Sequence, residues 1–341
     1  MKKTVVFLLL LYNACLFAQS TQWHVNPAEK ETAPVTLFKD PLYISVLKDR
    51  IFLKCPATAK SEPRPHNLME APPSEEQETR ILFDLGDKRM VIFAQEMNAL
   101  AGKNLLKDVK SLYTNAERAD YVFQEINTPD SMPAVLTLPA KHDTSQEAIL
   151  INSVLIETKD SSLIQIGAYI NPKAYSSLKA YLALSDSILK SAIAGNRKIE
   201  FHARNASLPL AGNLSKLIAE IPDHYLTIIK KGDDFTTYQI RKIQNITTSI
   251  PGGIIIYSGS HPSLLAPTYN FSPENGKEKT DLFLGKKMRW TCYDDETKKL
   301  HLKELIYDEG KGLKIHIAIV ASSEKELEAL DKIVRKMILR N

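Results

Sequence analysis

The sequence is poor in glycine, and its charges are nearly balanced. Only 13 of its 341 residues are glycine, which argues against glycine-rich phosphate-binding loops and collagen-like repeats. Lysine and arginine number 44 against 40 acidic residues, a net charge of +4. So small an excess does not predict nucleic-acid binding. With 44% hydrophobic and 25% charged residues, the composition is typical of a soluble globular protein, and the length suggests two domains.

The sequence also lacks the signatures of common enzyme classes. It contains neither a G-x-x-x-x-G-K-[ST] loop nor a G-x-S-x-G elbow, and its eight histidines form no H-E-x-x-H pair. The carboxylates cluster at Asp233-Asp234, Asp294-Asp295-Glu296 and Asp308-Glu309, where aspartate suits predicted turns. We therefore predict no catalytic residue, no cofactor and no metal site.

The N-terminus has the pattern of an export signal. Lys2 and Lys3 precede an apolar run at 4–12, and Leu16-Phe17-Ala18 offers a small residue for cleavage before Gln19. The run is shorter than the roughly 20 residues that cross a bilayer. Residues 1–18 are therefore interpreted as a signal peptide. The mature protein is expected to be periplasmic or secreted, without a transmembrane span.

Lipid anchoring at Cys15 is the alternative for this N-terminus. A lipoprotein signal also ends in a cysteine, but Tyr12-Asn13-Ala14 matches poorly the leucine and two small residues that usually precede it.

Two cysteines, Cys55 and Cys292, remain after cleavage at Ala18. In an oxidising compartment they could form a disulfide that joins the two halves of the chain. Both lie in segments whose residue pattern predicts a strand, where a cysteine often packs as a small apolar group. A disulfide and two buried thiols both remain open.

Composition divides the mature chain into a leader and two domains. A flexible leader is predicted at 19–40 and a first domain at 41–195, which contains a proline-rich loop at 56–78. The second domain is predicted at 196–341.

Helices and strands are expected to occur in a similar order in both domains. The apolar spacing predicts long helices at 172–194 and 323–339, each at the end of its domain, and a shorter helix at 213–220. Alternating apolar residues predict strands in most of the remainder, most clearly at 313–321.

The element order indicates an internal repeat. YISVLKDRIFLKC corresponds to LTIIKKGDDFTTYQI, and RMVIFAQE to GIIIYSGS. A single large α+β domain whose hairpins merely look alike is the alternative. The second half contains the segments GDDFTTYQIRKI, KKMRWTCYDD and LKIHIAIVASSEKELEALDKIV. Through these segments it resembles the Mog1/PsbP-like α/β/α fold. This resemblance implies an α+β protein of two related domains, each an antiparallel sheet with a long C-terminal helix packed on it. Members of that family are mostly binding or assembly factors.

A basic segment with two aromatic residues is the candidate partner-binding surface. It could contact an acidic envelope protein or a glycan, or simply form solvated strand edges where lysine blocks further pairing. The candidate residues are Lys286, Lys287, Arg289, Trp290, Lys298 and Lys299.

The leading hypothesis from the sequence is an exported, non-enzymatic binding or scaffold protein of the bacterial cell envelope. An envelope hydrolase with dispersed active-site residues and a lipid-anchored accessory subunit are the alternatives.

Mass spectrometry of the mature N-terminus tests the export signal. We expect a chain that begins at Gln19, because Ala18 offers the better cleavage site. An acylated Cys15 at the N-terminus would contradict this prediction and identify a lipoprotein.

Overall fold

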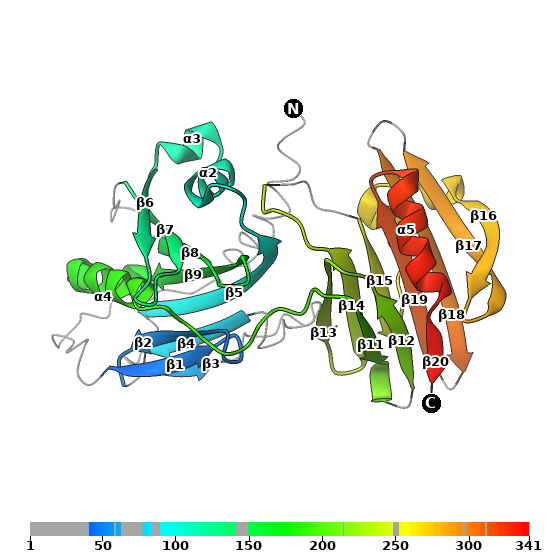
Figure 1. The fold of residues 1–341 in the computed structure, drawn as a ribbon, viewed down its shortest axis with the longest axis horizontal. Helices are drawn as coiled ribbons and strands as arrows, with labels where there is room; N and C mark the ends of the chain where they lie inside the picture. Colours follow the sequence, from blue (N-terminus) through cyan, green and yellow to red (C-terminus); the bar gives the residue numbers. More distant parts are fainter. Residues whose placement is uncertain are drawn as a thin grey trace. The chain divides into compact units, whose positions relative to one another are not determined.

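The computed structural model describes most of the chain after residue 40. The predicted signal peptide, the leader and most of the proline-rich loop lie outside the described residues. Those described are 41–57, 59–62, 78–83, 89–140, 149–213, 215–247, 252–295, 297, 299–310 and 312–340. They form two compact units (Figure 1). The first unit comprises the described residues up to 199 together with 245–247, and the second comprises the rest.

The first unit is built on a seven-stranded antiparallel sheet with the order β3-β4-β5-β9-β8-β7-β6. Its strands are β3 (Ala59–Glu62), β4 (Glu78–Phe83), β5 (Met90–Leu100), β6 (Tyr121–Asn127), β7 (Pro133–Pro139), β8 (Leu150–Glu157) and β9 (Ser162–Ile170). A three-stranded sheet contains β1 (Leu42–Val46), β2 (Ile51–Cys55) and β10 (Ile193–Ala194). The helices are α2 (Leu105–Ser111), α3 (Asn115–Arg118), η1 (Pro172–Ser177) and α4 (Leu178–Lys190).

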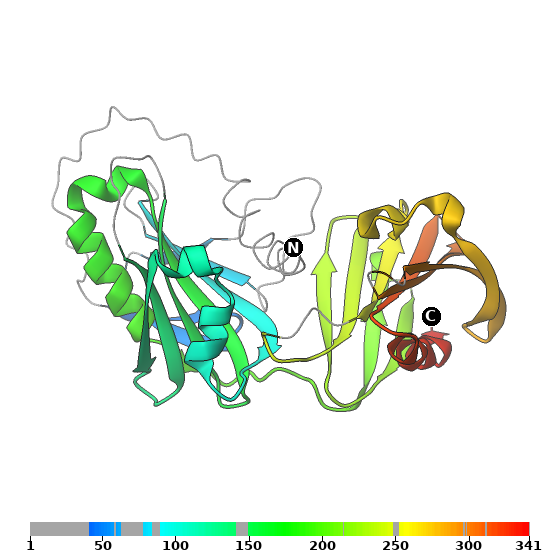
Figure 2. The same ribbon diagram turned by 90° about the horizontal axis from the view of Figure 1, so that it is seen from above.

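Both faces of the large sheet of the first unit are covered. Helix α4 lies along one face (Figure 2), where Tyr181 and Ile188 contribute to the main core. Helix α2 lies over the other face, where Leu105 and Val109 contribute to a smaller core. Strand β9 is consequently buried on both sides, which explains why it consists almost entirely of apolar residues.

The second unit has a seven-stranded antiparallel sheet with the order β13-β14-β15-β19-β18-β17-β16. Its strands are β13 (Tyr225–Lys231), β14 (Phe235–Lys242), β15 (Gly253–Gly259), β16 (Lys277–Phe283), β17 (Lys286–Asp295), β18 (Leu300–Gly310) and β19 (Leu313–Ala321). A second three-stranded sheet contains β11 (Arg204–Pro209), β12 (Lys216–Ile221) and β20 (Ile338–Arg340). The helices are η2 (Ala211–Asn213), η3 (Ala266–Tyr269), η4 (Pro273–Asn275) and α5 (Glu324–Arg335).

The two seven-stranded sheets pair their strands in the same order. Strands β3 to β9 take the same successive places in the first sheet as β13 to β19 take in the second. In each unit a helix follows the last strand of the large sheet, and a short strand then joins the three-stranded sheet.

The expected fold class, an α+β protein with one antiparallel sheet and a long C-terminal helix in each domain, is wrong. The described residues form mostly antiparallel strands in four sheets. The helix expected at 323–339 ends at Arg335, because Ile338–Arg340 pair with β12. The helix expected at 172–194 begins with the 3-10 turn η1, and its last residues pair with β2 as β10.

The short helix expected at 213–220 is also wrong. Residues Lys216–Ile221 form strand β12, in which Leu217, Ala219 and Ile221 are buried and the residues between them are more exposed. A short apolar run fits a helix or a strand equally well when only its periodicity is considered. The segment is a strand because it pairs with its sequence neighbour β11 and with β20, which lies more than 100 residues further along the chain.

The smaller core of the first unit contains a residue that lies far along the chain. Ile246 is buried there among Leu105, Val109 and Leu163. The Ile246 backbone N–H donates to the Leu100 carbonyl oxygen at 3.1 Å, which fixes the segment beside the end of β5. This residue follows β14 in sequence and nevertheless belongs to the first unit.

Truncation of Ile246 should therefore destabilise the first unit selectively. We expect Ile246→Ala to lower the free energy of unfolding by about 2–5 kcal/mol, the usual range for truncating a buried isoleucine to alanine. Thiol labelling read by mass spectrometry measures this effect, since Cys55 is buried in the first unit and Cys292 lies in the second. Faster labelling of Cys55 alone is expected. Ile306→Ala, at a position 38% exposed in the second unit, is the control, and equal effects from both variants would refute the assignment.

Candidate functional site: a buried arginine and carboxylate cluster

A strained turn between β1 and β2 directs Arg50 into the first unit. Leu47, Lys48 and Asp49 have φ angles of 55°, 50° and 61°, a left-handed conformation that is unfavourable for residues with a side chain. Ser45 supports the turn, because its Oγ accepts from the Asp49 backbone N–H at 2.9 Å. Arg50 follows this turn and is only 4% exposed.

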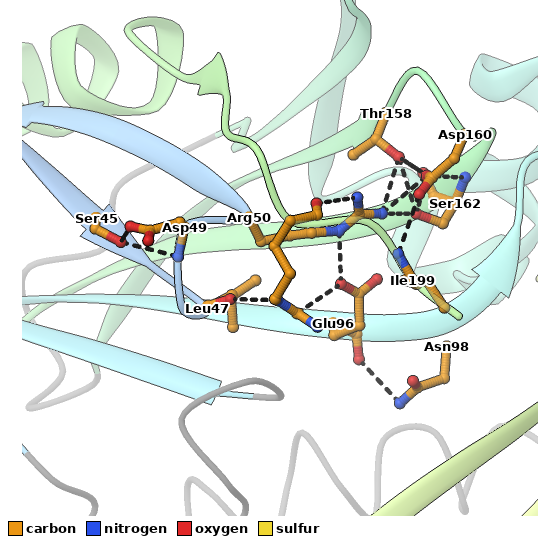
Figure 3. Close-up of polar contacts among 11 residues, drawn as sticks. Ser45, Leu47, Asp49, Arg50, Glu96, Asn98, Thr158, Asp160, Ser162 and Ile199 are labelled. Atoms are coloured by element: carbon orange, nitrogen blue, oxygen red, sulfur yellow. Dashed lines mark hydrogen bonds and ion pairs between the residues drawn. The ribbon is translucent and has the colours of Figure 1, made fainter. Parts of the chain in front are cut away.

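Five acceptors from distant parts of the chain surround the Arg50 guanidinium (Figure 3). Nε donates to Glu96 Oε2 at 3.2 Å, and Nη1 donates to the Arg197 carbonyl oxygen at 2.9 Å. Nη2 donates to Asp160 Oδ1 at 2.8 Å, to Thr158 Oγ1 at 3.2 Å and to Ser162 Oγ. An arginine cannot lose its charge, so burying it requires such partners.

The turn between β8 and β9 holds the more strongly acidic carboxylate of the cluster. Burial opposes the ionisation of Asp160, but hydrogen bonds from Arg50, Thr158 and Ser162 outweigh it and hold the Asp160 pKa well below its ordinary value. Asp160 Oδ1 accepts from Thr158 Oγ1 at 2.5 Å and from Ser162 Oγ at 2.7 Å. Asp160 is therefore the permanent counter-charge of Arg50.

Glu96 on β5 is the less well-solvated carboxylate. Burial raises the pKa of Glu96 to about 7, although Arg50 and Arg197 both act in the opposite direction. One oxygen, Oε2, accepts from Arg50, whereas Oε1 is buried without a hydrogen-bond partner in the described part of the chain. Fewer hydrogen bonds to its charged form agree with a raised pKa.

The cluster also fixes the segment that follows β10. The backbone N–H groups of Gly195 and Arg197 donate to the carbonyl oxygens of Arg50 and Asp49, both at 3.0 Å. The Ile199 backbone N–H donates to Asp160 Oδ2 at 3.2 Å. A side chain at position 195 would begin 2.0 Å from the Asp49 carbonyl oxygen, so the close approach requires glycine.

This arrangement is suited to holding the chain rather than to binding a ligand. The Arg50 guanidinium is hydrogen-bonded to five acceptors of the protein itself, one at Nε, one at Nη1 and three that share the two N–H groups of Nη2. The hydroxyls of Thr158 and Ser162 donate to Asp160, and both residues are buried. The cluster can therefore resist displacement of residues 195–199, and its guanidinium is engaged by groups of the protein itself.

The second unit contains a comparable cation cluster between its sheet and helix α5. Lys303 Nζ on β18 donates to Asp281 on β16 and to Asp331 on α5. Arg335 contacts the same two carboxylates. The Lys303 ammonium also lies 4.5 Å from the centre of the Trp290 ring, within the range of a cation–π interaction.

A buried histidine and glutamate pair lies on the other face of this sheet. His316 Nε2 on β19 lies 2.9 Å from Glu304 Oε2 on β18. Glu304 also accepts from the backbone N–H groups of Leu265 at 2.9 Å and Ala266 at 3.4 Å. These bonds fix the loop that begins η3. The same loop covers His316 and leaves it only 3% exposed.

The structure separates the residues of the candidate basic surface. Lys286, Lys287 and Arg289 are exposed near the start of β17, whereas Lys299 is exposed beyond its other end. A strand of this length spans about 30 Å at 3.3 Å per residue. Trp290 is fully buried and is unavailable to a partner, and Lys298 lies outside the described residues.

The two cysteines lie in different units, and both are free thiols. Burial raises the pKa of Cys55 to about 12 and also raises that of Cys292, so neither is an activated nucleophile. No group of three or more potential metal ligands comes together within the described residues. Ala18 and Gln19, at the predicted cleavage site, lie outside them.

The sequence did not indicate the Arg50 cluster. Its charged members stand at positions 50, 96, 160 and 197, without a spacing that marks a site. The one local signal is a lone arginine between two apolar strands.

Comparisons with known proteins identify little similarity. No protein-family model and no curated protein matches the chain. Among solved structures, it is similar to the solution structure of cyanobacterial PsbP (CyanoP) from Synechocystis sp. PCC 6803. That match has 13% sequence identity and a TM-score of 0.29, and it covers 48% of this chain and 98% of the other.

The raised pKa of Glu96 predicts a pH-dependent stability. The folded state holds the Glu96 proton more tightly than the unfolded state, whose value is 4.5, so this contribution is complete below pH 4.5 and is lost as pH rises through about 7. The unmodified protein should therefore lose stability as the pH rises from 5 to 8, whereas Glu96→Gln should not. Over this interval we expect the free energy of unfolding of Glu96→Gln to rise by roughly 2 kcal/mol relative to that of the unmodified protein. Protection of the Cys55 thiol, compared at equal pH, measures the stability of the first unit.

Asp160→Asn is the control, because the lowered Asp160 pKa stabilises the fold only above an unfolded value of 3.8. This variant should be destabilised at every pH between 5 and 8, and most at pH 5, because the Asp160 charge also raises the Glu96 pKa. A difference between Glu96→Gln and the unmodified protein that does not change with pH would contradict the role assigned to Glu96.

Proposed function

We propose that the chain is an exported binding or scaffold protein of the bacterial cell envelope and acts without catalysis. The export signal at residues 1–18 supports the location. No helix within the described ranges is long and apolar enough to cross a membrane.

The proposal rests on one observation: the clustered charged groups are buried and bonded to the protein itself. A catalytic acid, base or nucleophile must reach its substrate. Arg50, Lys303 and Glu304 are instead buried and bound to groups of the protein itself. Their bonds stabilise a turn, a helix and a loop. In the described part of the chain, these buried charged groups therefore stabilise the protein's own turns, helix and loop, and so the shape of its surface.

The start of β17 is the surface that we assign to an acidic partner, either an envelope protein or a glycan. Lys286 and Lys287 are exposed there, and Lys287 is paired across the strands with Leu282, which is 44% exposed. Arg289 is partly neutralised by Glu278 at 3.5 Å. Within the described residues neither lysine has an ion-pair partner, so the two lysines provide positive charge beside an apolar contact.

The internal repeat predicted from the sequence stays a proposal. The identical strand order of the two seven-stranded sheets supports it.

Cross-linking the mature protein in its own cell envelope, with capture and mass spectrometry, tests this function. We expect a reproducible partner whose capture falls about tenfold in the double variant Lys286→Glu/Lys287→Glu, since two charges are reversed. The control is Lys230→Glu/Lys231→Glu, which reverses two adjacent exposed lysines at the end of β13. Capture of no partner, or equal loss in both variants, would refute the proposal.

A further inference from the structure

Strand β6 forms one edge of the large sheet of the first unit. It pairs with β7 on one side, and within the described residues no strand pairs with its other side. The strand is seven residues long, and Val122 in it is 52% exposed. Such an edge presents free backbone N–H and C=O groups to another strand.

The other edges of the two large sheets are protected, whereas β6 is not. Strand β3 has only four residues. Strand β13 ends in Lys230 and Lys231, and the exposed edge strand β16 begins Lys-Glu-Lys. Short length and lysine are the usual means by which proteins prevent edge pairing. Strand β6, with the sequence YVFQEIN, has no lysine, arginine or proline.

We propose that two copies of this chain associate through antiparallel pairing of β6 with β6, centred on Gln124. Alternate residues share a face of a strand, so Val122, Gln124 and Ile126 lie on one face. In this register Val122 lies opposite the partner's Ile126, and Gln124 lies opposite the partner's Gln124. The apolar residues meet one another, and a neutral amide pair lies on the two-fold axis.

Charge complementarity on the opposite face favours a second copy as the occupant. Phe123 lies opposite the partner's Glu125 in the same register. The Lys110 ammonium of helix α2 lies 5.9 Å from the centre of the Phe123 ring. The pairing therefore brings the partner's Glu125 towards Lys110, and the two-fold axis repeats this attraction. Glu125 is the single charged residue of β6, and it faces no like charge on the opposite strand.

Sedimentation equilibrium of the full-length chain measures this association. We expect a reversible dimer, and Gln124→Lys should raise its Kd about tenfold or more, because two lysines then lie directly opposite each other. Thr280→Lys, at an exposed position of the equivalent edge strand β16, is the matched control and should leave the Kd unchanged. A chain that remains monomeric at every concentration overturns the proposal, as does a dimer unaffected by Gln124→Lys.

A charge exchange tests the contact with Lys110. Glu125→Lys should weaken the dimer about tenfold, since attraction becomes repulsion at two places. Adding Lys110→Glu to the same chain should restore the Kd. Protection of the Cys55 thiol checks that each variant remains folded. A double variant as weak as Glu125→Lys alone would show that the two charges do not meet and would reject this register.

Disulfide trapping tests the register independently of affinity. Directly opposed residues of an antiparallel pair have Cβ atoms about 5 Å apart, close enough for a disulfide after small adjustments. Gln124→Cys should therefore cross-link the two copies on mild oxidation. Val122→Cys, whose copies would lie four residues apart along the ladder, should not. Cross-linking of Val122→Cys in preference to Gln124→Cys would refute pairing centred on Gln124.

Discussion

The burial of the Arg50 guanidinium is the constraint on which the first unit depends. A permanent charge inside a protein is tolerated only where acceptors replace its lost hydration. The chain supplies them from β5, from the turn after β8 and from the segment after β10. Arg197 in turn bonds the left-handed turn, because its Nε donates to the Leu47 carbonyl oxygen and its backbone N–H to the Asp49 carbonyl oxygen, both at 3.0 Å. The turn and the buried charge are therefore held by the same segment. Removing a single acceptor would therefore affect three separate parts of the unit.

The second unit has the same strand order but uses different residues to fix its connections. Lys303 joins β16 to helix α5 through Asp281 and Asp331, and Glu304 holds the loop that begins η3. Strand order depends on which apolar faces must be covered, whereas each polar cluster depends on a few particular side chains. Two sheets can thus share a topology without sharing their buried charges. The chemistry of one unit is consequently a poor guide to that of the other.

Local patterns in the sequence located many strands, but they could not determine how the strands pair. The alternation at 313–321 marked β19 as a strand, although the structure buries both of its faces from Ile315 onward, one against α5 and the other under the loop that begins η3. Strand β12 was mistaken for a helix, since its identity depends on partners more than 100 residues away in the case of β20. The Arg50 cluster has the same origin, because its members meet only when distant turns come together. Trp290 was placed on the surface by its basic neighbours, whereas its own strand directs it into the core.

The contrast between β6 and β16 is informative because the two strands hold equivalent places in sheets of identical order. Constraints that strand pairing and sheet topology place on the edge strand are therefore the same for β6 and β16. Strand β16 carries exposed charges at its first three positions, Lys277, Glu278 and Lys279, whereas β6 carries only Glu125. In a monomeric protein, an edge strand without such charges is prone to unwanted pairing with other chains. The charges on β16 show that an edge strand at this place in the sheet can carry them. The fold that the two units share does not account for this difference, whereas the pairing proposed for β6 does.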